Sequence, residues 1–236
     1  MPYDVIIACD FGSAAETLAF LNRFGSDRPY VKVGMELYYA EGPAVVRALK
    51  ARGHRVFLDL KLHDIPNTVK KTMAVLSALD ADMVNLHAAG SRAMMEAALE
   101  GLTRPDGARP KLIAVTMLTS ISESAMNREL GIGGRLSDTV MHYAENARSA
   151  GLDGVVCSPL EAGDVHAACG PGFLTVTPGI RFADRDAGDQ VRITTPAAAG
   201  ALGADYIVVG RPITAAADPR AAYRRCLEEF MGGAQI

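Results

Sequence analysis

Eight short apolar runs, rich in β-branched residues, recur along the chain and are separated by segments with helical periodicity. The runs are VIIA (5–8), YVKV (30–33), VFLDL (56–60), MVNLH (83–87), LIAVTM (112–117), GVVCS (154–158), LTVT (174–177) and YIVV (206–209). Segments 14–24, 42–53 and 91–102, which lie between runs, are built from good helix formers. Strands that alternate with helices indicate βαβ units and a parallel sheet. Eight such units in 236 residues predict an α/β fold, the closed (β/α)8 TIM barrel, with a doubly wound open sheet as the alternative.

The composition excludes several classes of function. Of the 236 residues 49% are hydrophobic, enough for one large core, and no linker divides the chain, so we expect residues 1–236 to form a single domain. A formal net charge of −3 offers no basic field for nucleic acid, and each apolar run is far shorter than the roughly 20 residues of a membrane helix. The amino terminus lacks a basic region before its first apolar run, and the four cysteines form no CxxC pair. We therefore expect a cytoplasmic protein that binds neither nucleic acid nor membrane.

Polar residues stand at or just after the carboxyl ends of these runs. In a (β/α)8 barrel all the strands end at one mouth, where the active sites of barrel enzymes lie. The residues that this rule gathers are Asp10, Lys32, Asp59, Lys61, His87, Thr119, Ser120, Ser158, Arg181, Gly210 and Arg211. Ionisable side chains that are scattered along the sequence would thus converge, which favours an enzyme.

The segment DLKLHDIPNTV, residues 59–69, is the strongest local signal. Asp59 and Lys61 are two residues apart on a strand, so both side chains should point to one face, which in a barrel can be the interior. Asp64 follows as the strand ends, and Pro66 should keep the preceding residue extended. The alternative for Asp59 and Lys61 is a surface ion pair on an edge strand, worth less than about 1 kcal/mol.

Lys32 is a second charge within an apolar run, because it stands between two valines in YVKVG. It is either a strand residue that faces solvent or a cation at the barrel mouth. A buried ammonium group stays charged only when carboxylates pair with it, and Asp59 and Asp10 could do so.

Two arginine-bearing segments predict a site for a phosphate group. TPGIR (177–181) and VVGRPIT (208–214) follow the seventh and eighth runs, where barrels often bind phosphate through backbone N–H groups. Gly210 would permit a close backbone approach, and the guanidinium groups of Arg211 and Arg181 suit phosphate oxygens. The alternative is a pair of solvated surface arginines.

Taken together, these motifs resemble the orotidine 5′-monophosphate decarboxylase family. The matching segments are the Asp of ACDF, the Lys of VKVG, DLKLHDIPNTV, TMLTS (116–120), TPGIR, GDQVRITTP (188–196) and VVGRPIT. The match extends over essentially the whole chain, and its one small departure is ACD where many members read ALD. The resemblance implies a free-standing, bacterial-type TIM-barrel lyase that converts orotidine 5′-monophosphate to UMP in pyrimidine biosynthesis. It also implies a homodimer with shared active sites that needs neither a metal nor an organic cofactor.

The resemblance implies a role for each matched position. Lys61 would protonate C6 of the pyrimidine within a charged network of Lys32, Asp59, Lys61 and Asp64, where Asp64 reaches the neighbouring subunit's site. Asp59 would lie beside the departing carboxylate. The implied substrate contacts are Asp10 and Lys32 at the ribose, Thr68 from the partner chain, Thr119 and Ser120 at the ring, Arg181, Gln190, Gly210 and Arg211 at the phosphate, and also Ile65 and Pro178.

Two other functions fit parts of the sequence. A metal-dependent sugar-phosphate decarboxylase, typified by 3-keto-gulonate 6-phosphate decarboxylase, shares the barrel and the Asp-x-Lys-x-x-Asp strand, but it has a Glu that helps to bind Mg²⁺ where this chain has Lys32. A non-catalytic nucleotide-binding barrel would need the phosphate loops alone. No His, Asp or Glu cluster has a convincing metal spacing. We expect His63 to be a structural or surface residue, and we expect His87 either to line the mouth or to pack beside it.

Overall fold

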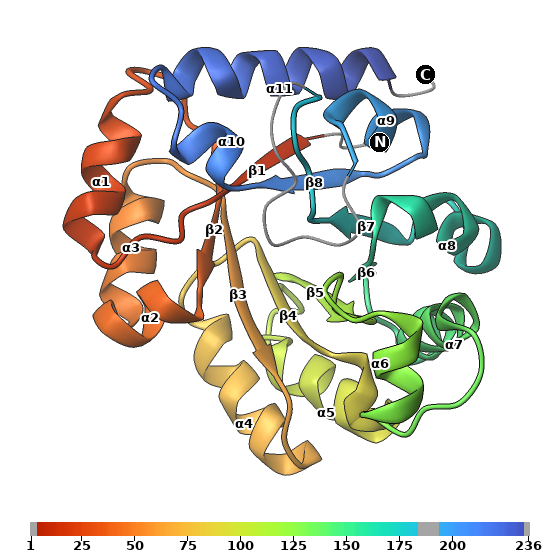
Figure 1. The fold of residues 1–236 in the computed structure, drawn as a ribbon. Coiled ribbons are helices and arrows are strands. Elements are labelled where there is room, and N and C mark those ends of the chain that lie inside the picture. Colours follow the sequence, from red (N-terminus) through yellow and green to blue (C-terminus); the bar gives the residue numbers. More distant parts are fainter. Residues whose placement is uncertain (1–3, 184–193, 234–236) are drawn as a thin grey trace.

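The computed structural model describes residues 4–183 and 194–233, and within these ranges eight parallel strands join in chain order into a closed barrel (Figure 1). The strands are β1 (Asp4–Ala8), β2 (Tyr30–Gly34), β3 (Val56–Leu62), β4 (Met83–His87), β5 (Lys111–Val115), β6 (Gly154–Val156), β7 (Leu174–Thr177) and β8 (Tyr206–Val209). Strand β8 pairs with β1, so the sheet has no edge and the TIM-barrel prediction is confirmed. Each strand coincides with a predicted run, although β5 and β6 end earlier than predicted because the chain there leaves the sheet to form loops at the mouth.

Helices between the strands cover the outside of the barrel (Figure 1). They are α1 (Ala14–Asn22), α2 (Met35–Glu41), α3 (Pro43–Ala51), α4 (Pro66–Ser77), α5 (Ser91–Leu102), α6 (Glu123–Arg128), α7 (Leu136–Ser149), α8 (Ala162–Cys169), α9 (Pro196–Ala201), α10 (Arg211–Thr214) and α11 (Pro219–Gly233), with short 3₁₀ turns η1 (Ala88–Gly90) and η2 (Pro159–Glu161). Local chemistry sets their starts: the Ser13 hydroxyl accepts the Glu16 N–H to cap α1, and Pro66 occupies the first position of α4. Nowhere in the described ranges is a helix long and apolar enough to cross a membrane.

Side chains alternate between the barrel interior and the layer that faces the helices. Tyr30 and Tyr206 open β2 and β8, and their rings meet edge to face with centroids 6.1 Å apart, so they fill the amino-terminal end of the interior. Two positions further along β2 stands Lys32, and two positions beyond the buried Phe57 of β3 stands Asp59. The interior is therefore apolar at its amino-terminal end and charged toward its mouth.

Helix α4, which follows the 59–69 segment, lies very close to α5 because of one glycine. A Cβ added at Gly101 of α5 would lie 2.0 Å from the carbonyl oxygen of Lys70 in α4. A side chain at this position would thus push the two helices apart. Gly101 therefore permits the close approach of α5 to α4.

The pairing of β3 with β4 is irregular where the charged motif lies. Leu58 pairs with Val84 and Leu62 pairs with Leu86, so β3 advances four residues while β4 advances two. Lys61, within this bulge, has a φ of 52°. This left-handed conformation costs a non-glycine residue about 1–2 kcal/mol. A bulge of this kind changes the direction of side chains and is frequent beside active sites.

Candidate active site

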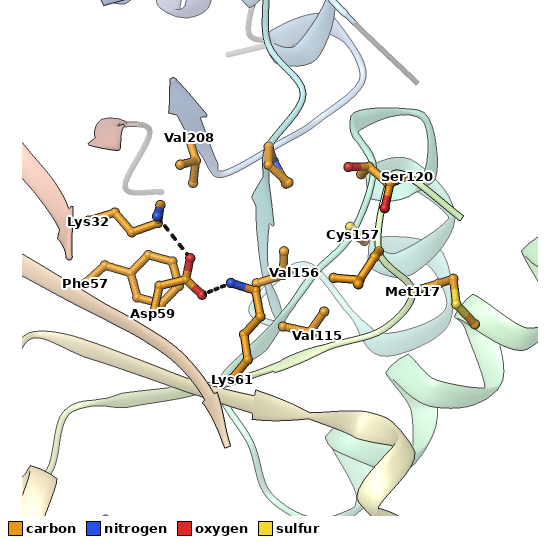
Figure 2. A pocket seen from close by; sticks show the side chains of 13 residues that line it. Lys32, Phe57, Asp59, Lys61, Val115, Met117, Ser120, Val156, Cys157 and Val208 are labelled. Atoms are coloured by element: carbon orange, nitrogen blue, oxygen red, sulfur yellow. Dashed lines mark hydrogen bonds and ion pairs between the residues drawn. The ribbon is translucent and has the colours of Figure 1, made fainter. Parts of the chain in front are cut away.

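A cavity of about 230 Å³ opens at the carboxyl ends of the strands (Figure 2). Part of its wall is apolar, and the remainder carries charged and hydroxyl side chains. The lining residues are Lys32, Phe57, Asp59, Lys61, Val115, Met117, Leu118, Thr119, Ser120, Val156, Cys157, Pro178 and Val208. An apolar wall opposite charged groups suits a planar polar ring, which needs contact on its faces and specific polar groups at its edge.

Lys32, Asp59 and Lys61 form a chain of ion pairs on the cavity wall (Figure 2). The Lys61 Nζ lies 2.6 Å from Asp59 Oδ1, and the Lys32 Nζ lies 3.2 Å from Asp59 Oδ2 and 2.9 Å from Asp10 Oδ1. Lys32 is 9% exposed and Asp59 is 7% exposed. The alternative in which Lys32 faces solvent is therefore wrong, and so is the alternative in which Asp59 and Lys61 form a surface ion pair. Charges buried to this degree require mutual pairing, and the structure supplies it.

Burial and neighbouring charges have opposing effects on the pKa values of Asp59 and Lys32. Burial alone would raise the pKa of the Asp59 carboxyl, but the charges of Lys32 and Lys61 and the hydrogen bonds from Lys61 and Asn85 hold that pKa below its usual value. Burial alone would lower the pKa of Lys32, but the carboxylates of Asp59 and Asp10 give it a net rise.

The direction of each pKa shift shows over which pH range Asp59 and Lys32 stabilise the fold. The lowered pKa of Asp59 stabilises the fold above the pKa of an unfolded aspartate, and this stabilisation is lost as the pH falls through the folded value. The raised pKa of Lys32 stabilises the fold below the pKa of an unfolded lysine, and this stabilisation is lost as the pH rises through the folded value. Asp59 and Lys32 are therefore both charged in the neutral range.

Of the predicted substrate contacts, Thr119, Ser120 and Pro178 line the cavity, and Asp10 stands at its edge through its bond to Lys32. Other predicted contacts do not line it. Arg181 follows β7 and donates its backbone N–H to the Thr194 carbonyl at 3.0 Å, and Gly210 and Arg211 lie at the start of α10. Gln190 lies outside the described residues.

Asp64, Ile65 and Thr68 lie away from their own chain's cavity. All three are exposed, and Ile65 is 66% exposed although it is a large apolar residue. The Asp64 carboxylate accepts the Ile65 backbone N–H at 2.6 Å, which directs it along the start of α4. The structure thus unites three members of the implied four-residue network, and it leaves Asp64 on the surface beyond the end of β3.

His63 and His87 contact each other and do not line the cavity. The rings of His63 and His87 lie 5.7 Å apart, and neither residue lines the cavity. Burial, His63 and Lys61 together lower the pKa of His87. Across residues 4–183 and 194–233, no three His, Cys, Asp or Glu side chains are grouped as metal ligands would be.

The sequence did not point to Asn85, a buried polar residue that contacts the network. Its carboxamide donates to Asp59 Oδ1 at 2.7 Å and accepts the Lys61 backbone N–H at 2.8 Å. The available signal was a polar residue at an inward position of the apolar run MVNLH, two residues after the inward-facing Met83.

Comparison with known proteins agrees with this geometry. The model of the orotidine 5′-phosphate decarboxylase / HUMPS family matches residues 3–226. The orotidine 5′-phosphate decarboxylase of Geobacillus sp. (strain WCH70) is 57% identical over 230 residues, which cover 96% of each chain. That of Bacillus caldolyticus is 58% identical over 231 residues, covering 97% of this chain and 95% of the relative. The crystal structure of the Lactobacillus acidophilus enzyme superposes with a TM-score of 0.86 at 41% identity, covering 97% of this chain and 99% of that one. Because the match spans nearly the whole chain and these two sequence relatives are more than half identical to it, the chain belongs to the orotidine 5′-phosphate decarboxylase / HUMPS family.

Proposed function

We propose that the chain decarboxylates orotidine 5′-monophosphate to UMP, with Lys61 as the group that protonates the pyrimidine. The observation that carries this proposal is the Lys61 ammonium on the cavity wall, 2.6 Å from a carboxylate that is nine-tenths buried. The names of the relatives select the pyrimidine substrate within the family. We infer that residues 1–236 act as one catalytic domain. We infer a cytoplasmic location because the four cysteines are free thiols, as in a reducing compartment.

The reaction needs electrostatic help at one carbon. When the bond between C6 and the carboxylate breaks, the electron pair remains on an sp² carbon that has no ring electron sink. An ammonium group beside C6 stabilises this pair, and it then transfers a proton to the same carbon. Carbon dioxide leaves, UMP carries the new C6–H bond, and the resulting neutral Lys61 amine takes a proton from water.

Asp59 and Lys32 have different tasks in this scheme. Asp59 fixes the direction of the Lys61 ammonium, because its Oδ1 lies 2.6 Å from the Lys61 Nζ. Asp59 would also lie beside the substrate carboxylate, where repulsion adds a secondary contribution. Lys32 holds Oδ2 of Asp59 and, together with Asp10, faces the ribose hydroxyls.

The rest of the nucleotide lies across the barrel mouth in this proposal. Thr119, Ser120 and Pro178 contact the ring from the loops after β5 and β7. We assign the phosphate to a group of residues after β7 and β8, namely Arg181, Gln190, Gly210 and Arg211. Guanidinium groups suit the phosphate because each presents several N–H donors in a planar fork.

We further propose a two-fold homodimer in which Asp64, Ile65 and Thr68 complete the partner's site. Its support is the exposure of these three motif residues, and of the apolar Ile65 above all, outside their own cavity. Met35, which follows β2, is also a large apolar residue and is 44% exposed. A two-fold interface would bury the same apolar surface on both chains and exchange the same residues between their sites.

Chelation tests the assignment against the metal-dependent branch. With EDTA present, the purified protein should consume orotidine 5′-monophosphate at its full rate, because a lysine occupies the β2 position where that branch places a metal-binding Glu. The loss of pyrimidine absorbance measures the rate, and a known magnesium-dependent decarboxylase in the same buffer confirms that chelation is complete. A strict requirement for Mg²⁺ would replace the pyrimidine assignment with a sugar-phosphate one.

Arg211→Ala tests the phosphate site. The substitution should lower kcat/KM for the nucleotide by roughly a hundredfold, since a charge-assisted contact to phosphate is worth up to about 3 kcal/mol. Orotidine, which lacks the phosphate, should react slowly with both proteins and at similar rates. Arg92→Ala serves as the matched control, because Arg92 pairs with Glu96 on the surface of α5. If Arg211→Ala slowed orotidine and the nucleotide equally, Arg211 would not be a phosphate ligand.

A further inference from the structure

Asn85 lies in the middle of β4, is 1% exposed, and does not line the cavity. Both ends of its carboxamide are engaged with β3. The oxygen accepts the Lys61 backbone N–H at 2.8 Å, and the Nδ2 donates to Asp59 Oδ1 at 2.7 Å. One side chain on the neighbouring strand thus contacts both members of the central ion pair.

The first contact compensates for the bulge in β3. In a regular parallel ladder a strand N–H donates to a carbonyl of the neighbouring strand, and a buried N–H without an acceptor is costly. The register between β3 and β4 shifts across this bulge, and here a side-chain oxygen accepts the Lys61 N–H. Asn85 therefore holds Lys61 at its φ of 52°, the conformation from which its ammonium reaches Asp59.

The second contact fixes the carboxylate. Asp59 Oδ1 accepts both from Asn85 and from the Lys61 Nζ, and Oδ2 faces Lys32. The carboxamide cannot be turned around, because that would place its NH₂ against the Lys61 N–H and its oxygen against the Asp59 carboxylate. Asn85 thus determines the position of the carboxylate between the two lysines.

We propose that Asn85 is a positioning residue for the decarboxylation, setting the place of the Lys61 ammonium through the Lys61 backbone and through the Asp59 carboxylate. This inference rests on the role proposed above for Lys61 and Asp59. Asn85 contacts no substrate in this account; its effect on the reaction passes through the two residues that it holds.

The charges around Asp59 predict how the loss of Asn85 changes the pH dependence. Several charged or titratable groups act on this carboxylate: Lys32 on β2 and Lys61 on β3 contact it, His87 on β4 interacts with it electrostatically, and Asp10 after β1 acts through Lys32. The Asn85 hydrogen bond acts in the same direction as the two lysines and lowers the pKa of Asp59. Removal of this bond should move the acidic limb of the kcat profile to higher pH.

Two substitutions separate the two contacts. Asn85→Ala removes both, and kcat should fall by about ten- to a hundredfold with KM within threefold, because small displacements of a reacting group have effects of this order. Asn85→Asp keeps the size and an acceptor for the Lys61 N–H, but it places a second carboxylate beside Asp59. Two adjacent carboxylates share a proton, so the acidic limb of Asn85→Asp should move further to higher pH than that of Asn85→Ala. Above its acidic limb, kcat should approach that of the unaltered protein for Asn85→Asp and stay at a lowered plateau for Asn85→Ala.

Thr175→Val is the matched control for lost stability. Thr175 is a fully buried β7 residue whose hydroxyl donates to Asp205 at 3.1 Å, and it does not line the cavity. This variant should lower Tm, as Asn85→Ala should, yet keep the kcat and the pH profile of the unaltered protein. If Asn85→Ala behaved like Thr175→Val, Asn85 would have a structural role alone and the proposal would be wrong.

The outcomes also separate this inference from the proposed function. If Asn85→Ala does not fold, the pH profile of the isosteric Asn85→Asp decides, and an unshifted profile with unchanged kcat overturns the proposal. If Lys61→Ala is inactive while both Asn85 variants turn over normally, the positioning role fails and the function stands. If Lys61→Ala is itself active, the role proposed for Lys61 is wrong, and the positioning role of Asn85, which rests on it, is wrong as well.

Discussion

Lys61→Ala is expected to lower kcat by about 10⁴-fold or more. General acid catalysis contributes roughly 10²–10⁴ to a rate, and one preorganised electrostatic contact at a developing charge contributes about 10²–10³. In the proposed reaction the Lys61 ammonium supplies both, because the same group stabilises the electron pair at C6 and then protonates it. The measurement is a single-turnover assay with excess protein, which detects rates far below those of a steady-state assay.

The variant should remain folded and should still bind UMP, because the residues assigned to the ring and the phosphate are unchanged. Lys111→Ala is a suitable control, since this exposed lysine begins β5 at the opposite end of the barrel and should leave kcat unaltered. A Lys61→Ala protein that kept more than a few per cent of its activity would show that the proton comes from another group, with Lys32 the nearest alternative on the cavity wall.

Asp64→Ala should also be nearly inactive alone, yet mixing it with Lys61→Ala should restore activity. In a mixed dimer of the proposed kind one site receives both defects, while the other receives an intact Lys61 from one chain and an intact Asp64 from its partner. Random pairing makes half of the dimers mixed, with one good site in two. Unfolding and refolding an equal mixture should thus recover about a quarter of the activity of the unaltered protein.

A second mixture provides the control for this experiment. Asp59 and Lys61 lie 2.6 Å apart within one chain, so a mixture of Asp59→Ala and Lys61→Ala leaves every site with one defect and should recover nothing. Mass spectrometry under native conditions confirms that mixed dimers have formed. Mixed dimers without recovered activity in the Asp64→Ala mixture would place Asp64 outside the partner's site, while the decarboxylase assignment would stand.

The barrel and half of its site were predictable from local patterns. Apolar runs of strand length report burial on both faces of a parallel strand, and polar residues at the ends of such runs must meet at one mouth. Alternation left open whether Lys32 and Asp59 face the barrel interior or the solvent, and their burial in the structure decides for the interior.

Asn85 and the bulge were beyond this kind of prediction. Alternation assigns Asn85 to an inward position, but its two hydrogen bonds depend on the register between β3 and β4, which no local pattern encodes. The prediction that Asp59 and Lys61 share a face is confirmed, but regular alternation is not the whole reason, because Lys61 is in the left-handed region. For Asp64, Ile65 and Thr68, only a resemblance could suggest a site, since their proposed partners belong to another chain.

The backbone at Lys61 also bears on how this barrel would change under mutation. Glycine or asparagine adopts a φ of 52° at less cost than lysine does, so the backbone alone would favour either of them here. Either residue would, however, take from the buried Asp59 carboxylate its partner at 2.6 Å, and breaking a buried ion pair costs about 3–5 kcal/mol, which exceeds what the backbone gains. Lysine can therefore leave this position at little cost only together with Asp59, since Lys32 would then keep Asp10 as its partner.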